Sequence, residues 1–198
     1  LQISGGSTTG SGGAINIGLG STLQFTGGTN TLSAGSSLTG AGDLVASSGT
    51  VNVNGTYGLT GNLTNSGATG TYAPTSGTLT PATVTVSGGS ATFGVDLTVP
   101  TLTLSGGTLT GTGNVNATNM VWSGGTLTGS GGFTVSNTLN LNGSTKILSG
   151  RTFTDNAASQ TTSAIAYDAT PATVQAALDA VLTPGDRSEE HTSELQSH

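Results

Sequence analysis

The sequence predicts an all-β protein, a right-handed parallel β-helix with about three short strands in each coil of 18–21 residues. The first observation is a repeat: SGG begins at residues 87, 105 and 123, and SGGTLTG occurs at 105–111 and again at 123–129. The second is that apolar and polar residues alternate between these glycines, as in TLTL and VNVN, which is the period of a half-buried strand. The third is that Gly, Ser and Asn, which form tight turns, separate the alternating segments.

The repeat predicts how the strands pair. Three short strands cannot bury an apolar face alone, but a coiling chain stacks each strand on its equivalent one coil later, in parallel. Leu109 then lies over Leu127, and residues 139 and 141 fall in register after a slip of one residue. The other shared columns are Leu97, Val115 and Phe133; Val99, Ala117 and Val135; Leu102 and Met120; and Leu104 and Trp122. Parallel crossovers are right-handed in about 98% of cases. An antiparallel β-sandwich is the rival, but it does not require equal spacing.

The coils are expected to occupy residues 1–156, about eight in all. The repeat is less regular in the N-terminal half. Residues 25–45 and 47–67 contain similar segments, but at spacings nearer 18 to 21 residues. Residues 71–86 are the most irregular part of the repeat, with Pro74 and Pro81.

The pattern changes after residue 156, where a short α/β remnant is expected. Residues 161–169 favour a strand, and 170–181 favour a helix with Thr170 at its N-cap and Pro171 in its first turn. We interpret 157–186 as the start of a truncated strand–helix module. Residues 187–198, RSEEHTSELQSH, resemble a translated sequencing adapter and are left out of the fold prediction.

The glycine-rich segments SGGTLTGTG and SSGTVNVNG resemble autotransporter-associated and filamentous-haemagglutinin-type β-solenoid repeats of large bacterial surface proteins. The segment 164–181 is similar to a strand–helix repeat of giant secreted bacterial proteins. The resemblance implies an exported protein, secreted or at the cell surface in association with the outer membrane. It implies a structural or adhesive stalk whose partner is an unknown surface glycan or protein receptor.

Composition argues against several other classes of protein. From residue 1 to 153 the charged residues are Asp43, Asp96, Lys146 and Arg151, so the chain has no basic surface for nucleic acid. No apolar run approaches the roughly 20 residues of a membrane span, and cysteine is absent. Unpaired strand edges at the coil ends lead us to expect an isolated chain that is marginally stable or self-associates.

The sequence predicts no catalytic, cofactor-binding or metal-binding residues, and so no enzyme. Both histidines and all glutamates lie in 187–198. Asp43 and Asp96 are nearly three coils apart, which is too far for a glycosidase carboxylate pair. Lys146 and Arg151 are expected to be surface charges, and Trp122 a core residue.

Two alternatives to the stalk stay open. One is a polysaccharide-active enzyme, because parallel β-helices house such enzymes. The other is an ice-binding face, because Thr108 and Thr110 lie over Thr126 and Thr128 in a TxT ladder of the kind that ice-binding solenoids use. Thr78 and Thr80, and Thr101 and Thr103, have similar T-L-T contexts. Only two consecutive coils keep the ladder, so the simpler interpretation is that threonine suits a solvated strand.

Overall fold

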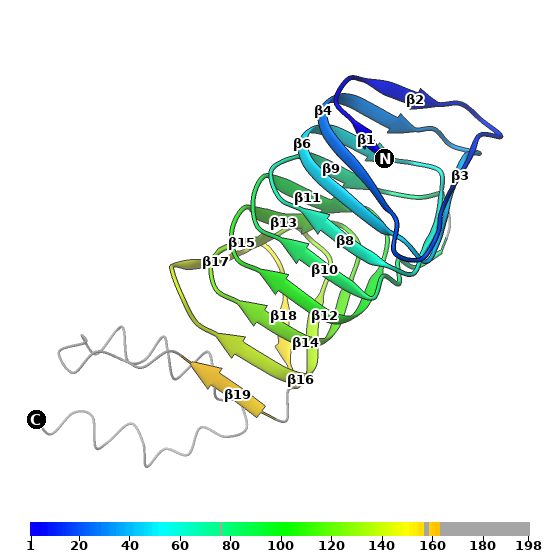
Figure 1. The fold of residues 1–198 in the computed structure, drawn as a ribbon. Coiled ribbons are helices and arrows are strands. Elements are labelled where there is room, and N and C mark those ends of the chain that lie inside the picture. Colours follow the sequence, from blue (N-terminus) through cyan, green and yellow to red (C-terminus); the bar gives the residue numbers. More distant parts are fainter. Residues whose placement is uncertain (76, 157–158, 163–198) are drawn as a thin grey trace, which may run out of the picture.

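The computed structural model describes residues 1–75, 77–156 and 159–162, and the chain forms a parallel β-solenoid of about 8 turns. Figure 1 shows the strands stacked along one axis, with the colours running in sequence order from blue to yellow. Every strand pairing in the described residues is parallel, which excludes the β-sandwich. Leu109 pairs with Leu127 on adjacent parallel strands, as the repeat predicts.

Each coil has three faces, and strands of one face stack on each other. Face 1 consists of β1 (Gln2–Ile3), the first halves of β4 (Thr22–Leu32) and β6 (Asp43–Val53), β8 (Asn62–Asn65), β10 (Thr83–Val86), the second halves of β12 (Leu97–Leu104), β14 (Val115–Trp122) and β16 (Phe133–Leu141), and β19 (Ser159–Thr162).

Face 2 consists of β2 (Ser7–Thr9), the second halves of β4 and β6, β9 (Thr69–Tyr72), β11 (Ser90–Phe93), β13 (Thr108–Gly111), β15 (Gly125–Thr128) and β17 (Lys146–Ser149). Face 3 consists of β3 (Ala14–Ile17), β5 (Ser37–Gly40), β7 (Thr56–Leu59), the first halves of β12, β14 and β16, and β18 (Phe153–Asp155).

The SGG repeat forms the corner between faces 1 and 2. Gly107 has φ of +66°, a conformation that side chains disfavour, and a Cβ there would lie 2.6 Å from the carbonyl oxygen of Gly89 in the previous coil. A Cβ at Gly106 would meet the oxygen of Ser87 at 2.6 Å, although its φ is not positive. SGG therefore recurs because the chain must turn tightly and approach the coil below at this corner.

Coil length varies more than the sequence predicts. Paired residues are 18 apart for Thr108 and Thr126, 19 for Leu44 and Leu63, and 21 for Thr31 and Asn52. The first coil is longer, since Ser7 and its partner Asn30 are 23 residues apart. The turns absorb the extra residues, so the strands stay in register.

Face 3 is interrupted between β7 and β12. The described residues between Tyr72 and Thr83 form no strand, and only an isolated bridge joins Leu79 to Leu97. Pro74 and Pro81 are both buried in this segment, where a missing N–H cannot support a ladder. The irregularity predicted for 71–86 is confirmed as a local loss of pairing on one face.

The core is a continuous stack of inward side chains. The predicted columns are confirmed, including the slip that pairs Met120 with Leu139 and Trp122 with Leu141. Trp122 is 6% exposed, as predicted for a core residue. Aromatic rings continue the stack, with Phe133 and Phe153 centroids 5.3 Å apart. Strand β19 extends face 1 by parallel pairing with β16. The rest of the predicted module at 157–186, its helix included, and the segment 187–198 lie outside the described residues.

Candidate functional surface

The two solenoid carboxylates lie at different corners. Asp43 begins β6, between faces 3 and 1, and its Oδ1 accepts hydrogen bonds from the backbone N–H of Asn62 at 2.8 Å and the Asn62 side chain at 3.0 Å. Asp96 lies between faces 2 and 3, and its Oδ1 accepts from the N–H of Asn114 at 2.8 Å. Each carboxylate therefore accepts a hydrogen bond from a backbone N–H of the next coil. The two carboxylates do not form an acid–base pair.

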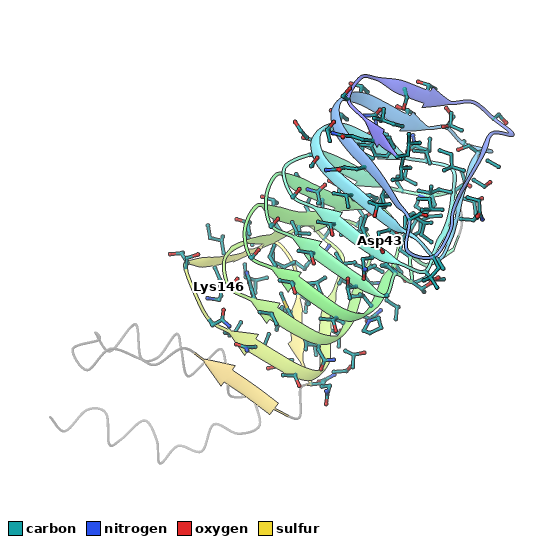
Figure 2. All side chains as sticks on the ribbon, viewed as in Figure 1. Asp43 and Lys146 are labelled. Atoms are coloured by element: carbon teal, nitrogen blue, oxygen red, sulfur yellow. The ribbon has the colours of Figure 1, made fainter. Side chains whose placement is uncertain are left out.

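The two cations lie near the other end of the described solenoid. Figure 2 shows Lys146 well separated from Asp43 along the axis. Lys146 is half-buried and donates to the carbonyl oxygen of Ser144 at 2.9 Å. Across the parts of the chain that the structure describes, no group of three His, Cys, Asp or Glu side chains could hold a metal, and no helix is long and apolar enough to cross a membrane.

The prediction that Arg151 is a surface charge is wrong. Its side chain is only 6% exposed and points inward, where Nη2 donates to the carbonyl oxygens of Gly111 at 3.0 Å and Gly113 at 3.3 Å. There is room for this side chain because the equivalent corner positions in the two preceding coils are glycines. They are Gly131 in the adjacent coil and Gly113 in the coil before it. Burial lowers the pKa of the Arg151 guanidinium. The glycines at the equivalent position in the two preceding coils were the sequence signal that a side chain could be buried here.

Face 2 carries a longer polar ladder than the sequence indicated. On each strand two side chains point outward, two residues apart, and the pairing places them in two files across six consecutive coils. The first file is Thr29, Thr50, Thr69, Ser90, Thr108 and Thr126. The second file is Thr31, Asn52, Thr71, Thr92, Thr110 and Thr128. All but Ser90 and Asn52 are threonine, so the ladder is not confined to two coils.

Unequal coil lengths hid this ladder from an alignment at 18 residues. Thr31 and Asn52 are 21 residues apart, so a fixed spacing puts them in different columns. The T-L-T at 101–103 is not part of it, because Thr101 and Thr103 lie on face 1 in β12, and Thr78 and Thr80 flank the isolated bridge on face 3.

The ladder is regular and uncharged. Neighbouring strands are about 4.8 Å apart and alternate residues on one strand about 6.6 Å apart, so the hydroxyl and methyl groups form a two-dimensional grid. Its side chains are half-buried or exposed, and none of the twelve positions is ionisable. Face 1 differs, because Asp43 and Val45 stand at its outward positions on β6. Face 2 is therefore more uniform than face 1 in the polar side chains that it presents.

Comparison with protein-family models, curated proteins and solved structures found no match to this chain.

Proposed function

We propose that residues 1–156 are a structural and adhesive stalk segment of an exported bacterial surface protein. The observation that carries the proposal is the unbroken stacking of inward side chains over about 8 turns. At about 4.8 Å per coil this gives a rod about 38 Å long. Because each coil is hydrogen-bonded to the coils on both sides, such a rod resists bending and holds whatever lies at its end away from the cell.

The surface chemistry also supports a stalk. Threonine, serine and asparagine cover the strands, and charged side chains are few, so adhesion would rely on hydrogen bonds and close fit to a glycan or a protein receptor rather than on charge. The same composition argues against a nucleic-acid partner. The resemblance of the SGG repeats to those of autotransporters supports export and an outer-membrane association.

Localisation and binding test the proposal together. Antibodies raised against the chain should label intact source cells, and the purified chain should bind a glycan or host-protein array without altering the ligand. Label that appears only after the cells are broken open would refute export. Release of reducing ends from polysaccharides, abolished by Asp43→Asn or Asp96→Asn, would instead establish the alternative of a polysaccharide-active enzyme.

The ladder on face 2 favours ice binding as a second candidate function. Ice is an uncharged lattice with fixed positions for hydrogen-bonding groups. A flat grid of hydroxyls and methyls can hold water in matching positions, and a rigid sheet loses little entropy in doing so. Six coils of ladder offer about 24 Å of such surface along the axis, five steps of about 4.8 Å.

Two T-L-T segments allow a matched test of this second function. Thr110 belongs to the ladder on face 2, whereas Thr103 stands half-buried on face 1 in the same local sequence. If the ladder binds ice, Thr110→Lys should abolish thermal hysteresis and Thr103→Lys should leave it intact. Absence of hysteresis in the unaltered chain, or equal loss in both variants, would exclude this function.

A further inference from the structure

We propose that Asn142 is a site of spontaneous deamidation, at which the side-chain amide is converted to a carboxylate without an enzyme. The sequence Asn-Gly occurs twice in the chain, at 54–55 and 142–143. A glycine after asparagine favours attack of its backbone nitrogen on the side-chain carbonyl carbon, because no Cβ hinders the approach. The two sites differ in how the fold holds that nitrogen, and this difference selects Asn142.

Asn142 lies in a corner between faces 1 and 2 that is longer than the SGG corner of the preceding coil. The pairs Trp122–Leu141 and Gly125–Lys146 enclose this corner in the two coils. Two residues lie between these positions in the preceding coil, and four lie between them in the coil that contains Asn142. The two additional residues change how the backbone of the corner is hydrogen-bonded.

The longer corner leaves one backbone N–H group without an acceptor. The N–H of Asn142 donates to the carbonyl oxygen of Trp122 in the preceding coil at 3.2 Å. The N–H of Ser144 donates to the oxygen of Ser123 at 2.7 Å. Gly143 lies between these two donors and is exposed, and among the described residues its own N–H donates to no oxygen. The nitrogen that attacks in deamidation is therefore not held by the fold.

The other Asn-Gly site is held by the coil before it. The N–H groups of Asn54 and Gly55 both donate to the carbonyl oxygen of Leu32, at 2.9 and 3.1 Å. Gly55 is buried, and a Cβ there would lie 2.5 Å from the carbonyl oxygen of Ser36. Because the attacking nitrogen is hydrogen-bonded and packed against backbone, this corner must open locally before Asn54 can react.

The reaction needs water alone as a co-reactant. The backbone nitrogen of Gly143 bonds to Cγ of Asn142 while the Cγ–Nδ2 bond breaks, and the proton from the N–H leaves with the amide nitrogen as ammonia. Water then adds to one of the two carbonyl carbons of the cyclic imide and breaks its bond to nitrogen, which regains a proton. One opening gives aspartate and the other gives isoaspartate. Nδ2 of Asn142 donates to Oδ1 of Asn140 at 2.9 Å, and water can replace this bond between two partly buried side chains.

The product carries a negative charge close to a lysine. Lys146 is the single charged residue between Asp96 and Arg151, and its Nζ donates to the carbonyl oxygen of Ser144 in the same corner. A carboxylate at position 142 would therefore offset the charge of this ammonium group. None of residues 142–145 belongs to the buried core, so the modified chain should stay folded and bind an anion exchanger more tightly.

The test is peptide mapping by mass spectrometry while the full chain is incubated at neutral pH, either folded or unfolded in urea. In the folded chain Asn142 should be converted about ten-fold faster than Asn54 or more, because the corner at Asn54 must first open. In urea the two sites should react at similar rates, since neither nitrogen is then held. In water enriched in heavy oxygen, the new carboxylate should contain the label.

Two matched variants assign the modification to its site. Asn142→Ser restores the residue type of the preceding SGG corner and should abolish the acidic form, whereas Asn54→Ser should leave its rate of formation unchanged. Circular dichroism checks that both variants fold like the unaltered chain. Equal conversion of Asn54 and Asn142 in the folded chain would overturn the proposal. So would an Asn142 that stays intact when folded but reacts in urea, or an acidic form that persists in folded Asn142→Ser.

Discussion

The corner glycines allow backbone conformation and steric approach to be tested separately by four alanine substitutions. Gly107 combines a φ of +66° with close approach, since a Cβ would lie 2.6 Å from the oxygen of Gly89 and 2.7 Å from the carbonyl carbon of Gly88. Gly106, in the same corner, has the close approach alone. Gly20 has φ of +76° with open space around it, and Gly18, in the same turn as Gly20, has neither constraint.

The expected costs follow from these contacts. Alanine at positive φ costs about 1–2 kcal/mol, so Gly20→Ala should lower the free energy of unfolding by that amount. Overpacking against backbone costs about 1–3 kcal/mol, which is the expectation for Gly106→Ala. Gly107→Ala should lose about 2–5 kcal/mol, a large part of the 5–15 kcal/mol typical of a domain. Gly18→Ala should be neutral or stabilise by about 0.4–1 kcal/mol, because alanine restricts the unfolded chain.

Urea unfolding measures all four variants on one scale. Trp122 is the single tryptophan and is buried, so its fluorescence reports loss of the core, and far-UV circular dichroism checks that the sheets unfold in the same transition. Each pair lies within one turn, so comparison within a pair removes differences in local stability between coils. If Gly107→Ala costs no more than Gly20→Ala, close approach of the coils does not explain the repeated SGG.

Two further predictions concern the core. Leu109→Ala should cost about 2–5 kcal/mol because Leu109 is fully buried, whereas Leu148→Ala should cost well under 1 kcal/mol because Leu148 is 47% exposed; equal urea midpoints would contradict the assigned core. Burial raises the pKa of Tyr57, and the charge of Asp43 adds to this, so the folded state keeps a proton that the unfolded state loses above about pH 10. Stability should therefore fall as pH rises above 10, and Tyr57→Phe should move the alkaline unfolding midpoint upward; an unchanged midpoint would refute the linkage.

The columns of the C-terminal coils could be predicted because the coil length is constant there. Leu97, Val115 and Phe133 stand 18 residues apart, and the turn between them always contains glycine, so one alignment places the whole column. The prolines at 74 and 81 also carried a physical signal, since neither can donate a backbone hydrogen bond, and pairing on face 3 fails where they stand.

An alignment of the sequence at a fixed spacing could not predict the full polar ladder on face 2 or the burial of Arg151. Turns that differ by a few residues change the sequence separation of paired positions from 18 to 23 without moving the strands, so Thr31 and Thr71 align in space and not in the sequence. Arg151 lies in a polar, glycine-rich turn that reads as surface, and the room for its side chain is created by glycines one and two coils away.

The sequence by itself determined that the chain forms short strands with one buried side and tight corners, because alternation and turn residues are local properties of the backbone. The tertiary structure alone decided which outward side chains share a face and which charge lies inside. Both depend on contacts between coils, and the turns that set those contacts differ in length from one coil to the next.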